Sequence, residues 1–222
     1  MRKEFVITRD GSHTIYLPEM DEHYHSTYGA IQESLHIYIG AGFMEVRQPQ
    51  ISILEIGFGT GLNAFLTCIQ AIQKNIQVNY FSLEKYPLGE EEYARLNYVE
   101  EGYRAHEELF TRLHQAKWGS VSEISPGFCL QKFQADVLQF DFNQVPKVDL
   151  LYYDAFAPNK QPELWNEALI GQISACVKPG GIVVTYCAKG AVRRAFASAG
   201  FDMERLPGPE GKKEIIRGRK RL

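Results

Sequence analysis

The chain has 222 residues, of which 45% are apolar and 23% are charged, and its formal net charge is −3 at pH 7. This length suits one α/β domain with a full core, or one domain with a small appendage. The net charge argues against a general nucleic-acid binder, and no apolar run is long enough to span a bilayer. The four cysteines are too dispersed for a disulfide framework or a zinc site. These properties predict a cytoplasmic protein without a metal ion.

Residues 1–48 are predicted to form a separate N-terminal element. Residues 6–18 have strand composition around an Asp-Gly turn, which favours a short hairpin. The residues from Tyr24 onward predict a loop and then a helix that ends near Gly40. A linker at 48–50 separates this element from the rest of the chain.

The remainder, 49–222, alternates between short apolar runs and amphipathic stretches, which predicts strands and helices in turn. Strands are expected at 51–57, 78–84, 128–136, 147–154 and 181–187, helices at 62–75, 162–181 and 191–201, a mostly helical insertion at 86–127, and a closing hairpin within 202–220. This order predicts a Rossmann-like α/β fold, with a mostly parallel twisted sheet and helices on both faces. Ligands of such sheets bind at the carboxyl ends of the strands.

The charges are distributed unevenly along the chain. Residues 189–221 contain ten Lys or Arg against four Asp or Glu, so this segment carries +6 and the rest carries −9. Such a split is typical of a basic patch for an anionic partner, although a solvated tail is an equal alternative.

A glycine-rich loop follows the first strand of the α/β series, in Glu55-Ile56-Gly57-Phe58-Gly59-Thr60-Gly61. Closely spaced glycines let the backbone approach a ligand, and the next helix offers its amino-terminal N–H groups. The third glycine comes one place too early for the dinucleotide fingerprint, and no Gly-Lys-Ser/Thr of a phosphate loop is present. The E-x-G-x-G-x-G spacing instead resembles the first motif of Rossmann-like S-adenosylmethionine-dependent methyltransferases.

Acidic residues end three successive strands beside this loop. Glu84 is placed to accept hydrogen bonds from two ribose hydroxyls, with a plain acid at a strand end as the alternative. At Asp136 the resemblance implies a contact with the adenine amino group, and a turn or a helix cap is the competing role. Asp154 is too far from the helix expected at Pro162 to cap it, and its carboxylate can orient an amine nucleophile and accept its proton.

Several stretches carry a more specific resemblance: DGSHTIYLPEMDEHYHSTYGAIQES, LEIGFGTGLNAF, YDAFAPNKQPELW, TYCAKGAVRRAFASAGF and ERLPGPEGKKEIIRG. They are similar to the methyltransferase domain of the bifunctional tRNA 5-methylaminomethyl-2-thiouridine biosynthesis family, MnmC, over essentially the whole chain. The D-x-F-x-P-x-K-x-P-x-x-W and L-P-G-x-x-G-K-K/R blocks are the specific signals. The resemblance implies an enzyme that uses S-adenosyl-L-methionine to methylate the 5-aminomethyl group of (2-thio)uridine at the tRNA wobble position.

The same resemblance assigns residues to the site. Asp154 would be catalytic and contact the substrate amine, and the N-terminal element 1–48 would cover the cofactor site. The residues expected at the cofactor are Glu55, Gly57, Gly59, Gly61, Asn63, Glu84 and Asp136. The residues expected at the tRNA anticodon loop are Tyr24, Gln32, Phe156, Pro158, Lys160, Lys189, Arg193 and Arg194.

Two-domain members of this family carry an FAD-dependent oxidase that produces the amine, and this sequence holds no second glycine fingerprint. We therefore expect a stand-alone methyltransferase that receives its amine from an upstream enzyme. Two alternatives stay open. One is a methyl- or aminopropyl-transferase for a free small-molecule amine, against which the basic segment 189–221 argues. The other is a non-catalytic module that binds the cofactor, against which the joint presence of the glycine loop and the three acids argues.

Overall fold

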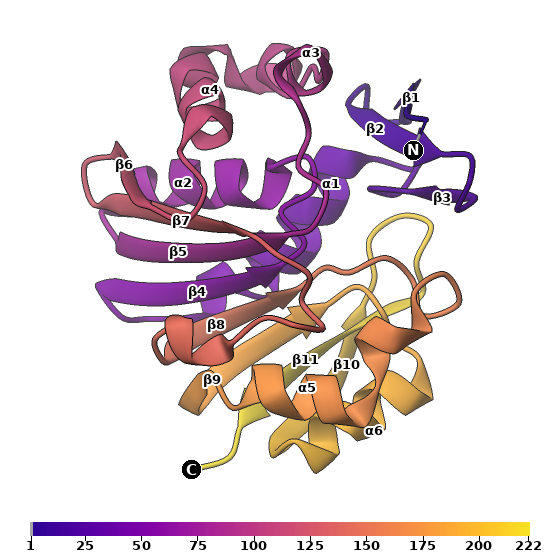
Figure 1. The fold of residues 1–222 in the computed structure, drawn as a ribbon, viewed down its shortest axis with the longest axis vertical. Coiled ribbons are helices and arrows are strands. Elements are labelled where there is room, and N and C mark those ends of the chain that lie inside the picture. Colours follow the sequence, from indigo (N-terminus) through magenta and orange to yellow (C-terminus); the bar gives the residue numbers. More distant parts are fainter. Residues whose placement is uncertain (1) are drawn as a thin grey trace.

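An eight-stranded sheet runs through the centre of the protein, in the order β10-β11-β9-β8-β4-β5-β7-β6 (Figure 1). The computed structural model describes residues 2–222. Neighbouring strands are parallel through β9 (Val177–Thr185), β8 (Val148–Tyr153), β4 (Gln50–Ile56), β5 (Gln77–Glu84) and β7 (Phe128–Gln134). The strands that pair antiparallel are β6 (Val121–Ser125), β10 (Phe201–Pro207) and β11 (Glu214–Lys220). The predicted mostly parallel sheet and the closing hairpin are confirmed.

Helices cover both faces of this sheet, as Figure 1 shows. One face carries α1 (Ala30–Ser34), α2 (Leu62–Lys74), α3 (Glu90–Tyr93) and α4 (Glu107–Gln115), and the other carries α5 (Glu167–Ser174) and α6 (Gly190–Ser198). Short 3-10 turns lie at Phe43–Glu45, Arg104–His106, Phe142–Gln144 and Pro162–Trp165, and π-helical turns lie at Leu35–Gly40 and Val99–Tyr103. No helix within residues 2–222 is both long and apolar enough to cross a bilayer.

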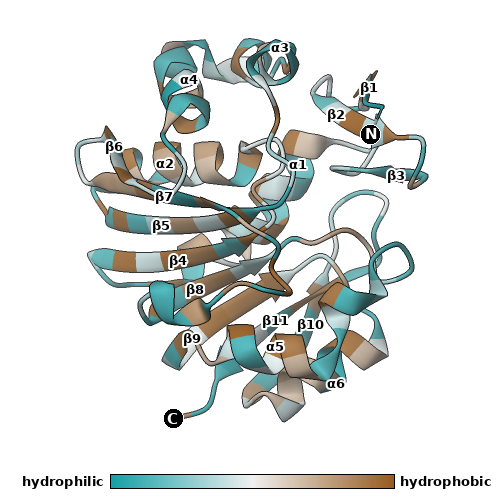
Figure 2. Ribbon diagram, in the orientation of Figure 1, coloured by the Kyte–Doolittle hydropathy of each residue, from teal (hydrophilic) through white to brown (hydrophobic). Residues whose placement is uncertain are grey.

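Apolar side chains fill the space on both faces of the sheet, and Figure 2 shows hydrophobic residues gathered on the central strands. Strand β8 is buried throughout. Its Leu150 and Tyr152 belong to the core under α2, while Leu151 and Tyr153 belong to the core under α5. This assignment follows from the two-residue period of a strand, and burial on both faces is typical of parallel strands covered by helices.

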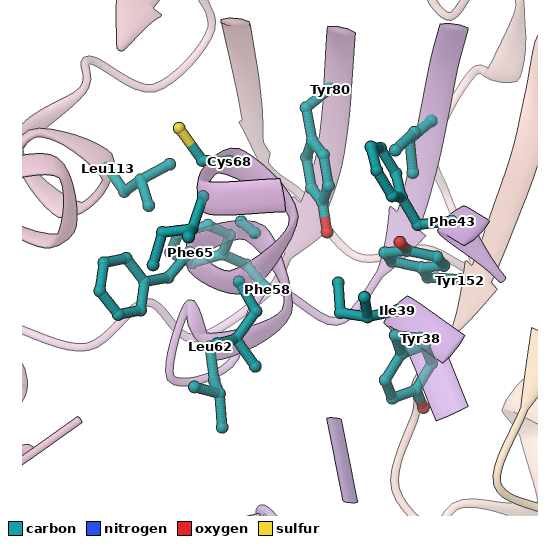
Figure 3. Packing of buried hydrophobic residues seen from close by; sticks show 14 of the residues in the cluster. Tyr38, Ile39, Phe43, Phe58, Leu62, Phe65, Cys68, Tyr80, Leu113 and Tyr152 are labelled. Atoms are coloured by element: carbon teal, nitrogen blue, oxygen red, sulfur yellow. The ribbon is translucent and has the colours of Figure 1, made fainter. Parts of the chain in front are cut away.

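The N-terminal segment forms a small antiparallel sheet of β1 (Glu4–Ile7), β2 (His13–Leu17) and β3 (Glu22–His23), which confirms the predicted hairpin. Helix α1 continues directly into the π-helical turn that ends at Gly40, as expected. Figure 3 shows that Tyr38 of this turn lies against Tyr152 of β8, and their ring centroids are 5.1 Å apart. The N-terminal segment therefore shares a core with the central sheet.

Strand β6 was not expected, because residues 86–127 were predicted to be mostly helical. The stretch VSEIS has only two apolar residues, Val121 and Ile124, and pairs antiparallel with β7 across a turn in which Gly127 has a φ of +81°. A left-handed conformation of this kind favours glycine in a tight hairpin. The segment 86–127 is therefore helical only up to α4.

The helix expected to end at Pro179-Gly180-Gly181 ends at Ser174 instead, and Val177 already belongs to β9. The register between β8 and β9 shifts between Val148 and Leu150, and the extra residues of β9 form a bulge there. Proline and glycine fit such a bulge because the ladder hydrogen bonds are interrupted. Lys178 anchors it through its Nζ, which lies 2.8 Å from Asp149 Oδ1.

Candidate active site

The site lies where the strand order reverses. Strand β4 has β5 on one side and β8 on the other, so the loops after β4 and β8 diverge and leave a crevice. The two loops touch at its base, where the N–H of Asp154 donates to the carbonyl of Ile56 at 3.0 Å. Gly57 has a φ of +94°, and a Cβ there would lie 2.6 Å from the carbonyl oxygen of Asp154. Only glycine fits this position.

A cavity of about 430 Å³ opens from this crevice. That volume is in the range of pockets that hold a small-molecule ligand, about 300 to 1,000 Å³. The cavity wall combines the carboxyl ends of β4, β5, β7 and β8 with the N-terminal segment around Tyr24 and the loop before β11. The wall includes these members of the predicted set: Tyr24, Gly57, Gly59, Asn63, Glu84, Asp136, Asp154 and Phe156.

Glu84 is fixed by backbone donors at the end of β5. Its Oε2 accepts from the N–H of Gly59 at 2.9 Å, and its Oε1 accepts from the N–H of Tyr86 at 2.8 Å. A carboxylate has about four acceptor positions, so both oxygens keep capacity for a ligand. The glycine loop and the carboxylate thus hold each other in place at the cavity wall.

Asp136 has two roles in the structure. Its Oδ1 accepts from the N–H of Leu138 at 3.0 Å, which is the turn that competed with ligand binding in the sequence. Its Oδ2 lies 2.8 Å from the Nζ of Lys85, and this pair and the Leu138 N–H hold the pKa of Asp136 below its usual range. Asp136 also lines the cavity, so the turn presents an ionised carboxylate to it.

Asp154 lies at the opposite end of the cavity. Its Oδ2 accepts from the Nδ2 of Asn63 at 2.8 Å. Burial raises the pKa of the Asp154 carboxyl to about 7, and the charge of Glu33 also raises this pKa. Hydrogen bonds from Tyr38 and Asn63 and the charge of Lys212 lower it. This carboxyl group therefore exchanges its proton near neutral pH, as groups in active sites often do.

Charged and aromatic side chains surround the Asp154 end. Lys212 Nζ lies 3.2 Å from Glu33 Oε1 and 4.9 Å from the ring centroid of Tyr186. The rings of Tyr24 and Phe156 meet edge to face, with centroids 5.1 Å apart. The sequence indicated Tyr24 and Phe156, but not the Glu33–Lys212 pair. Lys212 lies in the specific G-K-K block, which was the one available signal, whereas nothing in the sequence singled out Glu33.

Other predicted residues lie away from the cavity wall. Glu55 is buried behind it with 0% exposure, and a Cβ on Gly61 would face His114 instead. Gln32 is exposed beside Asp10, to which its N–H donates. Lys160 pairs with Asp21 at 3.3 Å, in the loop that also contains Pro158. Lys189, Arg193 and Arg194 lie at the start of α6, where Lys189 and Arg194 are exposed and Arg193 is half-buried.

The sheet, the glycine loop and the three strand-end acids define a Rossmann-like class I methyltransferase. Residues 111–221 match the model of the S-adenosyl-L-methionine-dependent methyltransferase family, and the chain belongs to that family. The cofactor is accordingly S-adenosyl-L-methionine. The residues present fit it, because a glycine cradle that a Cβ would fill lies beside carboxylates with free acceptor positions.

The sequence is also similar to individual proteins of known name. The chain is 30% identical over 229 residues to the tRNA 5-methylaminomethyl-2-thiouridine biosynthesis bifunctional protein MnmC of Cupriavidus metallidurans, covering 96% of this chain and 33% of that protein. It is 29% identical over 217 residues to the protein of the same name from Leptospira borgpetersenii, covering 90% and 32%. The chain thus spans about a third of the length of these relatives. The resemblance to their methyltransferase domain is confirmed.

A solved structure is also similar along nearly the whole chain. The crystal structure of MNMC2 from Aquifex aeolicus superposes with a TM-score of 0.80 and 27% sequence identity, and the match covers 98% of this chain and 69% of that one. The similarity of structure therefore agrees with the family that the sequence comparison shows.

Proposed function

We propose that this protein transfers a methyl group to the amine of a 5-aminomethyl-(2-thio)uridine at the wobble position of tRNA. The observation that carries the proposal is the position of Asp154, whose carboxyl lines the same cavity as the glycine loop and is held there by the Asn63 amide. The relatives support the choice of substrate, since they are named for the biosynthesis of 5-methylaminomethyl-2-thiouridine in tRNA.

Three parts of the wall would hold the cofactor. The backbone at Gly57 and Gly59 would lie against it, Glu84 would accept hydrogen bonds from the ribose hydroxyls, and Asp136 would accept from the adenine amino group. When bound, S-adenosyl-L-methionine supplies an electrophilic methyl group on a sulfonium. The open acceptor positions of Glu84 and Asp136 on the cavity side support these roles.

Asp154 would act on the substrate amine. An aliphatic amine is mostly protonated at neutral pH and has no free electron pair for nucleophilic attack. The Asp154 carboxylate attracts this ammonium, accepts one proton from it and leaves a neutral nitrogen in position. The neutral nitrogen would then have the free electron pair that it needs to take up the methyl group, and the cofactor would leave as a neutral thioether. The pKa near 7 suits this step, because a base works best when its pKa is near the working pH.

The surface around the cavity suits a single-stranded anionic loop. Lys189 is the N-cap of α6 and lies four residues after β9, whose carboxyl end faces the cavity side of the sheet. Lys189 and Arg194 are both exposed. A wobble base is already unpaired, so placing it in a pocket costs less than flipping a base out of a duplex. Tyr24 and Phe156 line the cavity, and such a base would stack on one of their rings. This substrate implies a cytoplasmic location and an upstream enzyme that supplies the primary amine.

The test is methyl transfer from labelled S-adenosyl-L-methionine to bulk tRNA from a strain that lacks this protein, followed by digestion and mass identification of the labelled nucleoside. We expect the label on 5-aminomethyl-uridine or its 2-thio form. Label on a free amine such as a polyamine, with none on tRNA, would replace this proposal by the small-molecule alternative. Cofactor binding without transfer to either would indicate a binding module.

A further inference from the structure

Behind the cavity wall, Glu55 forms part of a fully buried polar cluster. It is the penultimate residue of β4 and has 0% exposure. Its Oε2 accepts from the hydroxyl of Ser82 at 2.7 Å. Its Oε1 has no hydrogen-bond partner among residues 2–222. An unpaired carboxylate oxygen at such a depth would cost several kcal/mol, which proteins normally avoid by pairing or neutralising the group.

Asn63 connects this cluster to the active site. Its Nδ2 donates to Asp154 Oδ2 at 2.8 Å, and the same amide lies against the Glu55 carboxyl. Its Oδ1 is also buried without a partner, as is the hydroxyl of Tyr80, which lies beside Glu55. The Glu55 carboxyl lies next to the Asn63 and Tyr80 side chains, and each of these three side chains keeps one buried polar atom without a partner within the described residues. An ionised carboxylate and an amide oxygen can only accept, so a proton on Glu55 would supply a donor that the cluster lacks.

We infer that Glu55 is a neutral carboxylic acid that fixes the Asn63 amide and thereby orients Asp154 for the acceptance of a proton. A proton on Oε1 turns this oxygen into a donor, and the unpaired Asn63 oxygen and Tyr80 hydroxyl of the same cluster can accept from it. The Asn63 amide is then held with its nitrogen toward Asp154. Glu55 is a positioning residue, because it touches neither cofactor nor substrate.

The surroundings support a neutral Glu55. The groups that face it are Ser82 and Tyr80 on β5, Tyr152 on β8, Asp154 after β8 and Asn63 on α2. No cation is among them. Burial raises the pKa of Glu55 to about 8, and the nearby Asp154 charge adds to this shift against the hydrogen bonds from its neighbours. A charge on Asp154 therefore disfavours a second charge on Glu55, on the other side of the same amide.

This inference rests on the proposed role of Asp154, so the experiment has one part that needs no substrate. The carboxyl carbon of Glu55 is followed by ¹³C NMR from about pH 5 to about pH 9, with Glu55→Gln used to assign the signal. We expect the signal of the protonated acid up to about pH 7. A midpoint below about pH 6 would overturn the inference even if the protein proves inactive on tRNA.

The second part uses tRNA methylation by wild type, Glu55→Gln and Glu55→Leu. Gln keeps a neutral donor and an acceptor, so Glu55→Gln should stay within about threefold of wild-type kcat/KM at about pH 7, whereas Glu55→Leu should lose roughly tenfold or more. Wild type should lose activity above about pH 8, where Glu55 ionises, and Glu55→Gln should not. Glu91→Gln, at an exposed position in α3, is the matched control and should follow wild type.

Two results on an active wild-type enzyme would contradict the inference. One is equal loss in Glu55→Gln and Glu55→Leu, which would mean that the charge itself is required. The other is the same alkaline fall in wild type and Glu55→Gln. If wild type does not methylate tRNA at all, the proposed function fails, while the NMR titration still decides the state of Glu55.

Discussion

At the scale of single residues, the proposed role of Asp154 sets catalysis against stability. Its carboxyl is held in a desolvated position that disfavours its charge, whereas the proposed reaction needs that charge. A group whose pKa rises on folding binds its proton more tightly in the native state. It therefore stabilises the fold at low pH and loses that contribution as the pH rises through the native pKa.

We predict that kcat/KM rises with pH through about 7, because the ionised form of Asp154 is the one that accepts a proton. Asp154→Asn should lower kcat by about 10²- to 10⁴-fold and abolish this rise. Methyl transfer to tRNA at several pH values measures both. Near wild-type turnover in Asp154→Asn would remove this residue from the mechanism.

Asp154→Asn should also change how the stability of the fold depends on pH. The native pKa of Asp154 is raised from 3.8 to about 7, so wild type should lose stability relative to Asp154→Asn between these values and keep the difference above them. Thermal unfolding of both proteins without cofactor measures this difference. An equal pH dependence of Tm in the two proteins would show that the carboxyl is not perturbed.

Glu84 should matter for the cofactor and not for the substrate. Glu84→Ala removes the acceptor proposed for the ribose hydroxyls and releases the N–H groups of Gly59 and Tyr86. We expect S-adenosyl-L-methionine to bind about 10- to 100-fold more weakly, which corresponds to the loss of one or two charge-assisted hydrogen bonds. Isothermal titration calorimetry measures this, with the exposed Glu90→Ala as the control. Unchanged affinity would rule out the ribose contact.

At the scale of elements, the loop between β10 and β11 (residues 208–213) closes the cavity from the far end of the chain. Figure 1 shows this yellow loop reaching toward β3. Arg9 lies 3.3 Å from Glu210 and stacks on Tyr28 at 4.3 Å, and Lys212 pairs with Glu33. Gly211 has a φ of +81°, and a Cβ there would overlap the ring of Tyr28. The loop can lie this close only with glycine at that position.

Gly211→Ala should therefore displace the loop from the N-terminal segment and move Lys212 away from Glu33. We expect kcat/KM to fall roughly tenfold while Tm changes by only a few degrees, because the loop and its partner Tyr28 lie outside the hydrophobic core. Gly119→Ala is the matched control, since Gly119 has a φ of +76° with no atom within 4 Å of the added Cβ. Equal activity in both variants would show that the loop does not shape the site.

Several elements were predictable from local pattern, and others were not. The runs before Gly57, Glu84 and Asp154 are short and apolar, so both the parallel strands and the acids at their ends follow from the sequence. Strand β6 was missed because VSEIS is short and follows a helix. The end of α5 was misplaced because Pro-Gly-Gly usually stops a helix, whereas here it forms a bulge in β9.

The parts of the site that were not predictable depend on tertiary structure. Glu33 comes from α1 and Lys212 from the β10–β11 loop, and no spacing in the sequence relates them. The packing of the core also determines where the side chain of a motif residue points. Glu55 belongs to the glycine motif, yet β4 turns its side chain behind the wall toward Ser82. Motif membership predicts a location near the ligand, but not the direction of the side chain.

At the scale of the whole molecule, ion pairs neutralise part of the basic segment. Arg205, Arg217 and Arg221 pair with Glu214, Glu204 and Asp202, and Lys212 pairs with Glu33. Arg193 is half-buried, with its Nε enclosed. Lys189 and Arg194 are exposed at the amino end of α6, which makes them the better candidates for contacts with RNA.

We expect the double variant Lys189→Glu and Arg194→Glu to lower tRNA methylation by about tenfold or more at low salt. Raising the salt concentration should narrow the gap to wild type, and the affinity for S-adenosyl-L-methionine should stay the same. Arg219→Glu is the control, because Arg219 is exposed on β11 opposite Ile182, at the other end of β9. Equal losses in the control and the double variant would indicate a general charge effect.

The meeting of the N-terminal segment with the β10–β11 loop also affects how the enzyme matures on the ribosome. The strands that carry the glycine loop, Glu84 and Asp154 are all synthesised before β11. The cavity wall still lacks Lys212, and Glu33 lacks its cation, until the last hairpin has emerged. Translation proceeds from the amino end at about 5 to 20 residues per second. A nascent chain therefore spends seconds with an incomplete pocket. The Asp154 end of the cavity is therefore complete only when the β10–β11 hairpin has been translated. A chain truncated before this hairpin should neither close the cavity nor methylate its substrate.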